Sequence, residues 1–330
     1  MPLRLRFGTD DLMRCRFAVS PLCETHEAVR TLRRRARHGY HQPWLRRNRA
    51  ILAGLDLSAL WLLMPAGGYT PDFLGPPPDG PSTSIEEELK RLRGTDPEAA
   101  HREFTRSLAC TPGAAESKPG RAMLDDPAAA VRRLAGLTER VWHALIAPDW
   151  PRLHDLLTAD IAHRSRELAD DGLEGLFADL HPRLSWADGT LTVAGNSAPP
   201  EAGDLDGRGV LLMPSVFVWP DVISGFAAPW QPTIIYPARG MGTPWQTVPE
   251  PPDALVRLLG PNRAAILIGL DEPASTTALA GRHGLAPSSV SAHLSVLRDA
   301  GLLTSHRQRQ QVHYERTPLG VALIRTTKGT

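Results

Sequence analysis

The sequence contains few cysteines and no long apolar run. Its three cysteines, Cys15, Cys23 and Cys110, include no Cys-x-x-Cys pair, which argues against a disulfide framework and is typical of a reducing compartment. No stretch approaches the roughly 18 apolar residues that a membrane-spanning helix needs, and the first residues lack the apolar core of a signal peptide. We therefore expect a cytoplasmic protein with free thiols and no membrane segment.

Sequence signatures of catalysis are also missing. The chain has no GxxxxGK[ST] phosphate loop, no GxSxG nucleophile elbow, no HExxH and no GxGxxG followed by a suitable acid. Single histidines are scattered, and such residues are more often surface or core side chains than metal ligands: His101, His143, His154, His163 and His181. We expect no enzyme activity, metal or cofactor, and keep an enzyme domain fused to a DNA reader as an alternative.

Length and charge indicate two domains with different roles. The 330 residues exceed the usual size of one small module, and 42% of them are hydrophobic, enough for folded cores. From Asp253 onward nine Lys/Arg face five Asp/Glu, a net charge of +4, whereas residues 1–252 carry −3. The excess positive charge therefore lies in the C-terminal part, which favours that part as a nucleic-acid reader.

The N-terminal part mixes helical and strand patterns, so we predict an α+β fold. Helices are expected at 84–93, where Ser84 and Glu87 fit a capping box, at 97–109, at 126–147 and at 150–180. Strands are expected at 3–7, 209–213, 216–219 and 233–236, and residues 184–193 form a hairpin signal because Asp188-Gly189 suits a type I′ turn. We predict a regulatory or dimerisation domain, mixed helical with a small antiparallel sheet, over 1–245, and a linker at 246–252.

Eight arginines occur between residues 30 and 49 without a single acid. Such a run can contact phosphate or form a solvated helix face. We favour the solvated face.

The C-terminal part shows a helix-turn-helix pattern. Helices are expected at 261–270, 276–283 and 288–300, with a turn at Leu285-Ala286 and a stop at Gly301. Val290, Leu294 and Leu297 share one stripe of the third helix and should face the core. Small polar residues on the opposite side allow close approach to the major groove.

Two short strands, around 302–305 and 312–314, predict a wing. Its tip carries Arg307, Arg309 and Gln310. Arginine at such a tip lies along phosphates or enters the minor groove, which adds affinity with little base discrimination. We therefore predict a winged helix-turn-helix over 253–330.

Leu279-Ala280, followed by LAPSSVSAHLSVLRDAGLL at 285–303, resembles the ArsR-type winged-helix family of bacterial repressors. The resemblance covers about a quarter of the chain. It implies that Ser288, Ser289, Ser291 and His293 contact DNA, and that the protein is a homodimer that reads a pseudo-palindromic operator in double-stranded DNA. The full set of expected DNA contacts adds Thr276, Thr277, Ala292, Ser295, Arg307, Arg309 and Gln310.

The chain departs from this family in two respects. Metal-sensing members carry a cysteine pair in the helix before the recognition helix, and residues 276–283 contain no cysteine, which excludes a thiolate metal site there. The long N-terminal extension resembles actinobacterial regulators that join an uncharacterised domain to an ArsR-like module. We expect a transcriptional regulator, a repressor by resemblance, whose signal enters through the N-terminal domain.

The nature of that signal stays open. One hypothesis is an apolar effector pocket formed by Trp219, Trp230, Tyr236 and Trp245, although aromatic residues serve equally well as core. A redox switch between Cys15 and Cys23 would need a helix break near Ser20-Pro21, and buried free thiols are the simpler interpretation. The alternative to a DNA reader is a winged helix that binds only proteins.

Overall fold

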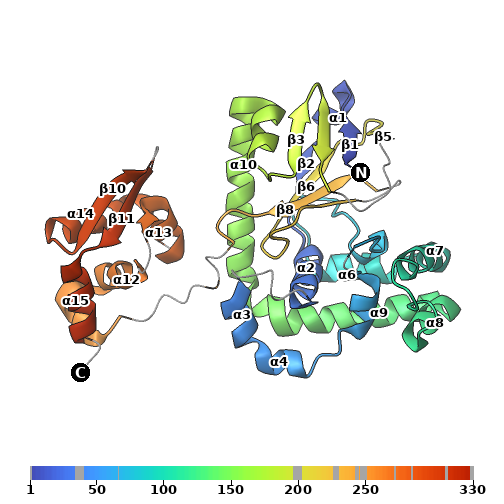
Figure 1. Ribbon diagram of the computed structural model, residues 1–330, viewed down its shortest axis with the longest axis horizontal. Helices are drawn as coiled ribbons and strands as arrows, with labels where there is room; N and C mark the ends of the chain where they lie inside the picture. The colour runs from blue at the N-terminus through green and yellow to red at the C-terminus, as the bar shows by residue number, and fades with distance from the viewer. Residues whose placement is uncertain are drawn as a thin grey trace. The chain divides into compact units, whose positions relative to one another are not determined.

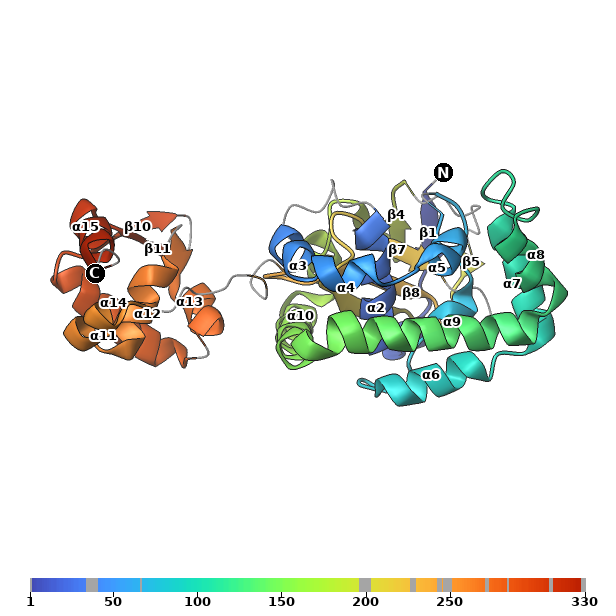
Figure 2. The same ribbon diagram turned by 90° about the horizontal axis from the view of Figure 1, so that it is seen from below.

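The computed structural model describes residues 2–33, 41–65, 67–195, 203–225, 230–241, 245, 251–270, 273–283, 285–308 and 311–327. It divides into two compact units, Met1–Gly242 (unit 1) and Thr243–Thr330 (unit 2), shown in Figures 1 and 2. The boundary lies three residues before the predicted end of the N-terminal domain at 245. Most of the predicted linker, residues 246–250, lies outside the described residues.

Unit 1 begins with a strand, a short helix and a second strand, and then becomes mostly helical. Its first elements are β1 (Leu3–Arg6), α1 (Thr9–Met13), β2 (Arg16–Phe17), α2 (Pro21–Arg33), α3 (Gln42–Arg47), α4 (Arg49–Ala53), α5 (Ser58–Leu63) and the 3₁₀ turn η3 (Asp72–Leu74). Its later helices are α6 (Ile85–Arg93), α7 (Pro97–Leu108), α8 (Lys118–Asp125), α9 (Pro127–Val141), the π-helical turn η4 (Trp142–Ile146), the 3₁₀ turn η5 (Ala147–Asp149) and α10 (Trp150–Ala178). The remaining strands are β3 (Leu184–Ala187), β4 (Thr190–Val193), β5 (Gly203–Asp204), β6 (Leu211–Ser215), β7 (Ile223–Gly225) and β8 (Thr233–Pro237).

The strands of unit 1 form two four-stranded sheets. One has the order β3-β4-β1-β5, with β1 antiparallel to β4 and parallel to β5. The other has the order β2-β6-β8-β7, in which β2, β6 and β8 run parallel and β7 is antiparallel to β8. The α+β class is confirmed, but the expected single antiparallel sheet is replaced by two sheets of mixed direction. Alternation along one strand does not show which distant strand pairs with it.

Local sequence signals are reproduced in detail. Glu87 N–H donates to Ser84 Oγ at 3.2 Å, and Ser84 N–H donates to Glu87 Oε2 at 3.1 Å, which completes the predicted capping box. Asp188 and Gly189 have φ values of 49° and 70°, as a type I′ turn between β3 and β4 requires. The predicted helix over 126–147 keeps α-helical geometry only to Val141 and then widens into η4.

Residues 216–219 do not form the predicted strand. Val216 N–H donates to both carboxylate oxygens of Glu24, at 3.2 and 3.1 Å. The N–H groups of Phe217 and Val218 donate to Ser215 Oγ. Side chains thus take the backbone donors that a strand would give to a neighbouring strand, so the apolar run is a buried turn.

Helix α2 lies at the centre of unit 1. It contacts α5, α6, α9, η4 and β6, and eleven of its thirteen residues are buried although several are polar. His26 Nε2 lies 3.1 Å from Thr138 Oγ1, and Thr31 Oγ1 donates to the Phe217 carbonyl at 3.1 Å. A helix with polar residues all round reads as solvent-exposed in sequence, which is why its central position was not predicted.

Unit 2 contains the predicted winged helix with one further helix at each end. Its elements are α11 (Asp253–Leu259), α12 (Pro261–Gly269), β9 (Ala274–Ser275), α13 (Thr276–His283), α14 (Pro287–Asp299), β10 (Leu303–Gln308), β11 (Gln311–Arg316) and α15 (Pro318–Thr327). The strands form a sheet of order β10-β11-β9. Apolar side chains of α12, α13 and α14 share one core with α11, α15 and the sheet.

Among the residues that the structure describes, no helix combines the length and apolar character needed to cross a bilayer.

Candidate nucleic-acid interface

Helices α13 and α14 pack as the two helices of a helix-turn-helix. Leu279 of α13 and Val290, Leu294 and Leu297 of α14 are each at most 1% exposed and belong to one core. Leu285 N–H donates to the Ala280 carbonyl at 3.0 Å, which ends α13 and sets the turn. Gly301, with φ of 71°, ends α14 in the left-handed conformation that glycine adopts at little cost.

The face of α14 opposite the core is covered by small residues. Ser288, Ser289, Ser291 and Ala292 are exposed, as predicted, whereas His293 and Ser295 are half-buried. Because two residues turn a helix by about 200°, Ser291 and His293 lie on opposite flanks of this face. The predicted contacts therefore separate into a central strip at Ser288 and Ala292 and two flanks.

The two ends of α14 differ electrostatically. Ala286 precedes the helix with no side-chain cap, and Pro287 occupies the first turn, so first-turn backbone N–H groups and the positive end of the helix dipole point outward there. At the other end Asp299 is exposed and lies 3.3 Å from the Arg298 guanidinium. A phosphate backbone is attracted to the first end and repelled by an exposed carboxylate at the second.

The wing is a regular antiparallel hairpin. Arg307 of β10 pairs in register with Val312 of β11. The Arg307 side chain, together with Arg309 and Gln310, lies outside the described residues, as does the side chain of Thr277. Thr276 is half-buried at the start of α13.

A histidine pair on the wing was missed by sequence reasoning. His306 and His313 are cross-strand partners with ring centroids 6.1 Å apart and nearly parallel planes. His306 Nδ1 lies 3.9 Å from a Glu315 carboxylate oxygen. Their alternate positions on β10 and β11 were visible in sequence, but the register that joins them depended on the turn.

Three contacts hold the wing and the last helix to the core. Arg316 Nε donates to the Leu270 carbonyl, and the Thr317 hydroxyl donates to the Gly301 carbonyl at 2.7 Å. A Cβ on Gly320 would lie 2.4 Å from the Leu302 carbonyl oxygen. Helix α15 thus approaches the start of β10 more closely than a side chain would allow.

The four aromatic residues of the hypothetical effector pocket do not form one described cluster. Tyr236 is fully buried, and its hydroxyl donates to Asp160 at 2.9 Å. Trp219 and Trp230 are half-buried in unit 1, whereas Trp245 is buried and belongs to unit 2. The role of Tyr236 in this structure is to anchor β8 to α10.

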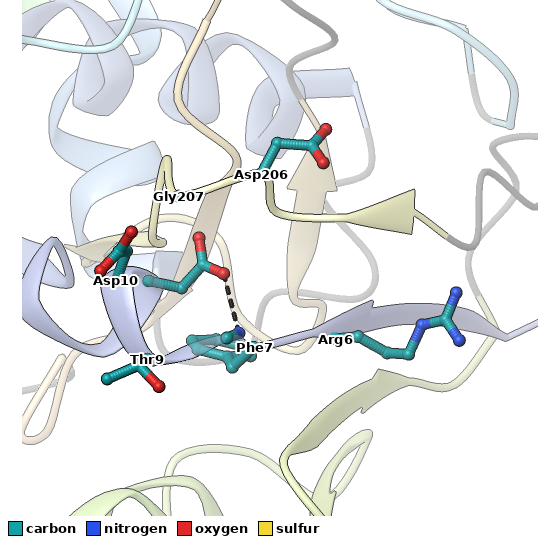
Figure 3. A pocket seen from close by; sticks show the side chains of 8 residues that line it. Arg6, Phe7, Thr9, Asp10, Asp206 and Gly207 are labelled. Carbon is teal, nitrogen blue, oxygen red and sulfur yellow. Dashed lines mark hydrogen bonds between the residues drawn. The ribbon is translucent and has the colours of Figure 1, made fainter.

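A cavity of about 610 Å³ lies elsewhere in unit 1, and its lining includes none of these four aromatic residues (Figure 3). It is lined by Arg6, Phe7, Gly8, Thr9, Asp10, Asp11, Asp206 and Gly207. Asp11 accepts the N–H of Gly8 at 2.9 Å and that of Gly209 at 3.0 Å, which fixes α1 against the loop before β6. Sequence reasoning missed this cavity because its residues belong to β1, α1 and a turn 200 residues later.

The cysteines are free thiols. Helix α2 begins at Pro21, so Cys15 and Cys23 lie on different elements, as the expected helix break requires. Burial raises the pKa of Cys15 and raises that of Cys23 well above the usual value, with the Glu27 carboxylate adding to the second shift. Both thiols are therefore poor sources of the reactive thiolate.

Buried carboxylates surround the start of α2. Burial raises the pKa of Glu24 to about 8 and that of Glu88 to about 7. Glu88 Oε2 accepts Leu22 N–H at 2.8 Å, and Glu24 accepts Val216 N–H. These carboxylates therefore bond the protein's own backbone. Among the described residues, no three His, Cys, Asp or Glu side chains are grouped to hold a metal ion.

Comparison with known families now decides the identity of the C-terminal module. Residues 258–306 match a family model described as a helix-turn-helix domain. The match runs from α11 into β10 and includes all of α13 and α14. Unit 2 therefore carries a DNA-binding helix-turn-helix of the regulator type.

The same comparison places residues 82–242 with a model described as a family of unknown function (DUF5937). This match covers α6 to the end of unit 1. No curated protein and no solved structure matches the chain.

Proposed function

We propose that the protein is a sequence-specific transcriptional repressor of the ArsR type, acting in the cytoplasm as a homodimer on a pseudo-palindromic operator. The observation that carries this proposal is the exposed face of α14, where Ser288, Ser289 and Ala292 stand opposite a fully buried stripe. A helix covered by short side chains enters a major groove without steric conflict, and hydroxyl groups read base edges.

In the proposed complex α14 enters the groove with its first turn foremost. The uncapped N–H groups near Pro287 contact phosphate, and Asp299 stays away from the backbone. The wing crosses the flanking backbone with Arg307 and Arg309. His293 and Ser291, on opposite flanks, contact different strands or different base pairs.

A homodimer would bring two copies of α14 to successive turns of the duplex. Helices α11 and α15 contact each other and each carries an exposed leucine, Leu258 at 63% and Leu319 at 58%. Exposed leucines on neighbouring helices support this pair as the surface that joins two copies.

Unit 1 is proposed to regulate rather than to catalyse. The buried carboxylates of α2 are bonded to backbone N–H groups, which gives them a structural role. The thiolate metal site of metal-sensing relatives is absent from residues 276–283, so the proposed signal is a small-molecule effector or a change in unit 1 itself.

The test is selection of bound sequences from a random duplex library with the full chain, followed by anisotropy titration on the selected duplex. Ala292→Glu places a carboxylate in the groove and should lower affinity at least tenfold. Ala122→Glu, on exposed α8 of unit 1, makes the same charge change and should leave affinity unchanged.

Two results would overturn the proposal. Failure to enrich any sequence, with weak retention on heparin, would support a winged helix that binds proteins only. Equal affinities of the Ala292→Glu and Ala122→Glu variants would remove α14 from the interface.

A further inference from the structure

The outward face of α9 is a stripe of arginines. Its buried side carries Val131, Leu134, Ala135, Leu137, Thr138 and Val141. Arg132, Arg133 and Arg140 are exposed on the other side, with half-buried Gly136 between them. Arg133 and Arg140 are seven residues apart, so they share one side of the helix about 10 Å apart along its axis.

The acids close to this stripe are already engaged. Asp126, before the first turn, caps Ala129 N–H at 2.9 Å, and Glu139 pairs with Arg93 of α6 at 2.7 Å. Within the described part of the chain, Arg132, Arg133 and Arg140 have no ion-pair partner. Their charges therefore face solvent uncompensated, although residues 1–252 are net negative.

Helices α3 and α4 extend this basic surface. Arg46 and Arg49 are exposed on them, and residues 42–55 contain no acid. Arg47 pairs with Asp149, which follows α9 by way of η4 and η5, and so holds α3 near the end of α9. Helix α4 lies beside α9 in both views (Figures 1 and 2).

We infer that these five arginines, Arg46, Arg49, Arg132, Arg133 and Arg140, form a second DNA-binding surface, the α9 basic face, which contacts phosphates of the duplex flanking the operator. Segregated positive charge on a net negative unit is the electrostatic signature of a polyanion site. Arginine is suited to phosphate because its planar guanidinium donates two parallel hydrogen bonds.

Duplex DNA fits this surface better than a protein partner does. Stable protein interfaces are centred on apolar or aromatic anchors, whereas the residue between the arginines of α9 is Gly136. A glycine there lets a smooth backbone approach, and the contacts would be independent of sequence. This inference rests on the proposed function, since it assumes that unit 2 brings the chain to DNA.

The experiment measures the salt dependence of binding by the full chain to a labelled mixed-sequence duplex of about 60 base pairs. Arg133→Gln with Arg140→Gln removes two charges from the α9 basic face. The matched control, Arg102→Gln with Arg121→Gln, removes two exposed charges from α7 and α8. Circular dichroism melts of both double variants should match the wild-type melt, because all four side chains are exposed.

We expect the slope of log affinity against log salt to fall by about 2 in the α9 variant and to stay unchanged in the control, since each phosphate contact contributes about 0.9. Sequence preference on the selected operator should be retained. An α9 variant with the wild-type slope overturns this inference, even if it has lost an acidic protein partner. Absence of DNA binding by the wild-type chain instead overturns the proposed function.

Discussion

The carboxylate of Glu24 accepts the backbone N–H of Val216 through both oxygens, at 3.2 and 3.1 Å. This contact joins the central helix of unit 1 to the turn after β6. It replaces a strand that the apolar sequence favoured, and it places an acid in an interior where burial raises its pKa to about 8. Two predictions follow from buried groups of this kind.

The stability of unit 1 should fall as pH rises above 6.5. Glu24 has a pKa of about 8 when folded, against an ordinary value of 4.5, so the folded state binds the extra proton and stabilisation is lost as pH rises toward 8. Glu88, raised to about 7, acts in the same direction. His26, whose pKa burial lowers to about 3, acts oppositely but only below 6.5.

Denaturant melts between pH 6.5 and about 9 should therefore lose on the order of 2 kcal/mol of unfolding free energy. Glu24→Gln keeps an acceptor for Val216 and removes the titration, so its profile should be flatter. Glu86→Gln, at an exposed position of α6, is the control and should follow the wild type. Parallel wild-type and Glu24→Gln profiles would contradict the assignment.

Tyr236→Phe should destabilise unit 1 without changing DNA affinity. The substitution removes the hydroxyl that donates to Asp160 at 2.9 Å and leaves that carboxylate with the Arg239 N–H at 3.0 Å. The expected cost is about 1–3 kcal/mol, because a buried acceptor loses one partner. Thermal melting checks the stability, and an unchanged melt would return Tyr236 to the effector-pocket hypothesis.

Sequence patterns predicted the parts of this fold that depend on near neighbours. The Ser84–Glu87 box, the Asp188-Gly189 turn and the buried stripe of α14 are determined within a few residues, so local rules suffice. The candidate DNA-reading face of unit 2 is of this local kind. Its opposed flanks at Ser291 and His293 follow from helix geometry alone.

Other features depended on distant partners and could not be predicted. Strand β2 pairs with β6 across nearly the whole unit, Arg16 opposite Leu211, and two residues carry too little pattern to predict it. The polar residues of α2 are buried because Thr138, Phe217 and Val216 supply their bonds from elsewhere in the sequence. The α9 basic face likewise became visible only when α4 and α9 were seen to lie together.

The wing should supply sequence-independent affinity. Arg307→Ala with Arg309→Ala is expected to weaken binding similarly on all duplexes and to lower the salt slope by about 1 for each lost phosphate contact. Anisotropy titrations over a range of salt on the selected operator and on a scrambled duplex measure both effects. Loss of affinity confined to the operator would assign these arginines to base readout instead.

The last prediction concerns the dimer. Leu258→Glu with Leu319→Glu places two charges on the adjoining helices α11 and α15, where a second copy would desolvate them at high cost. The side chains are 63% and 58% exposed in one copy, so the fold of unit 2 should survive. Sedimentation velocity should show monomers in place of dimers, and operator affinity should fall because each half-site then binds separately. Leu12→Glu with Met13→Glu, at exposed apolar positions of α1, is the matched control and should remain dimeric. A double variant of α11 and α15 that sediments as the wild type would exclude this face as the dimer contact.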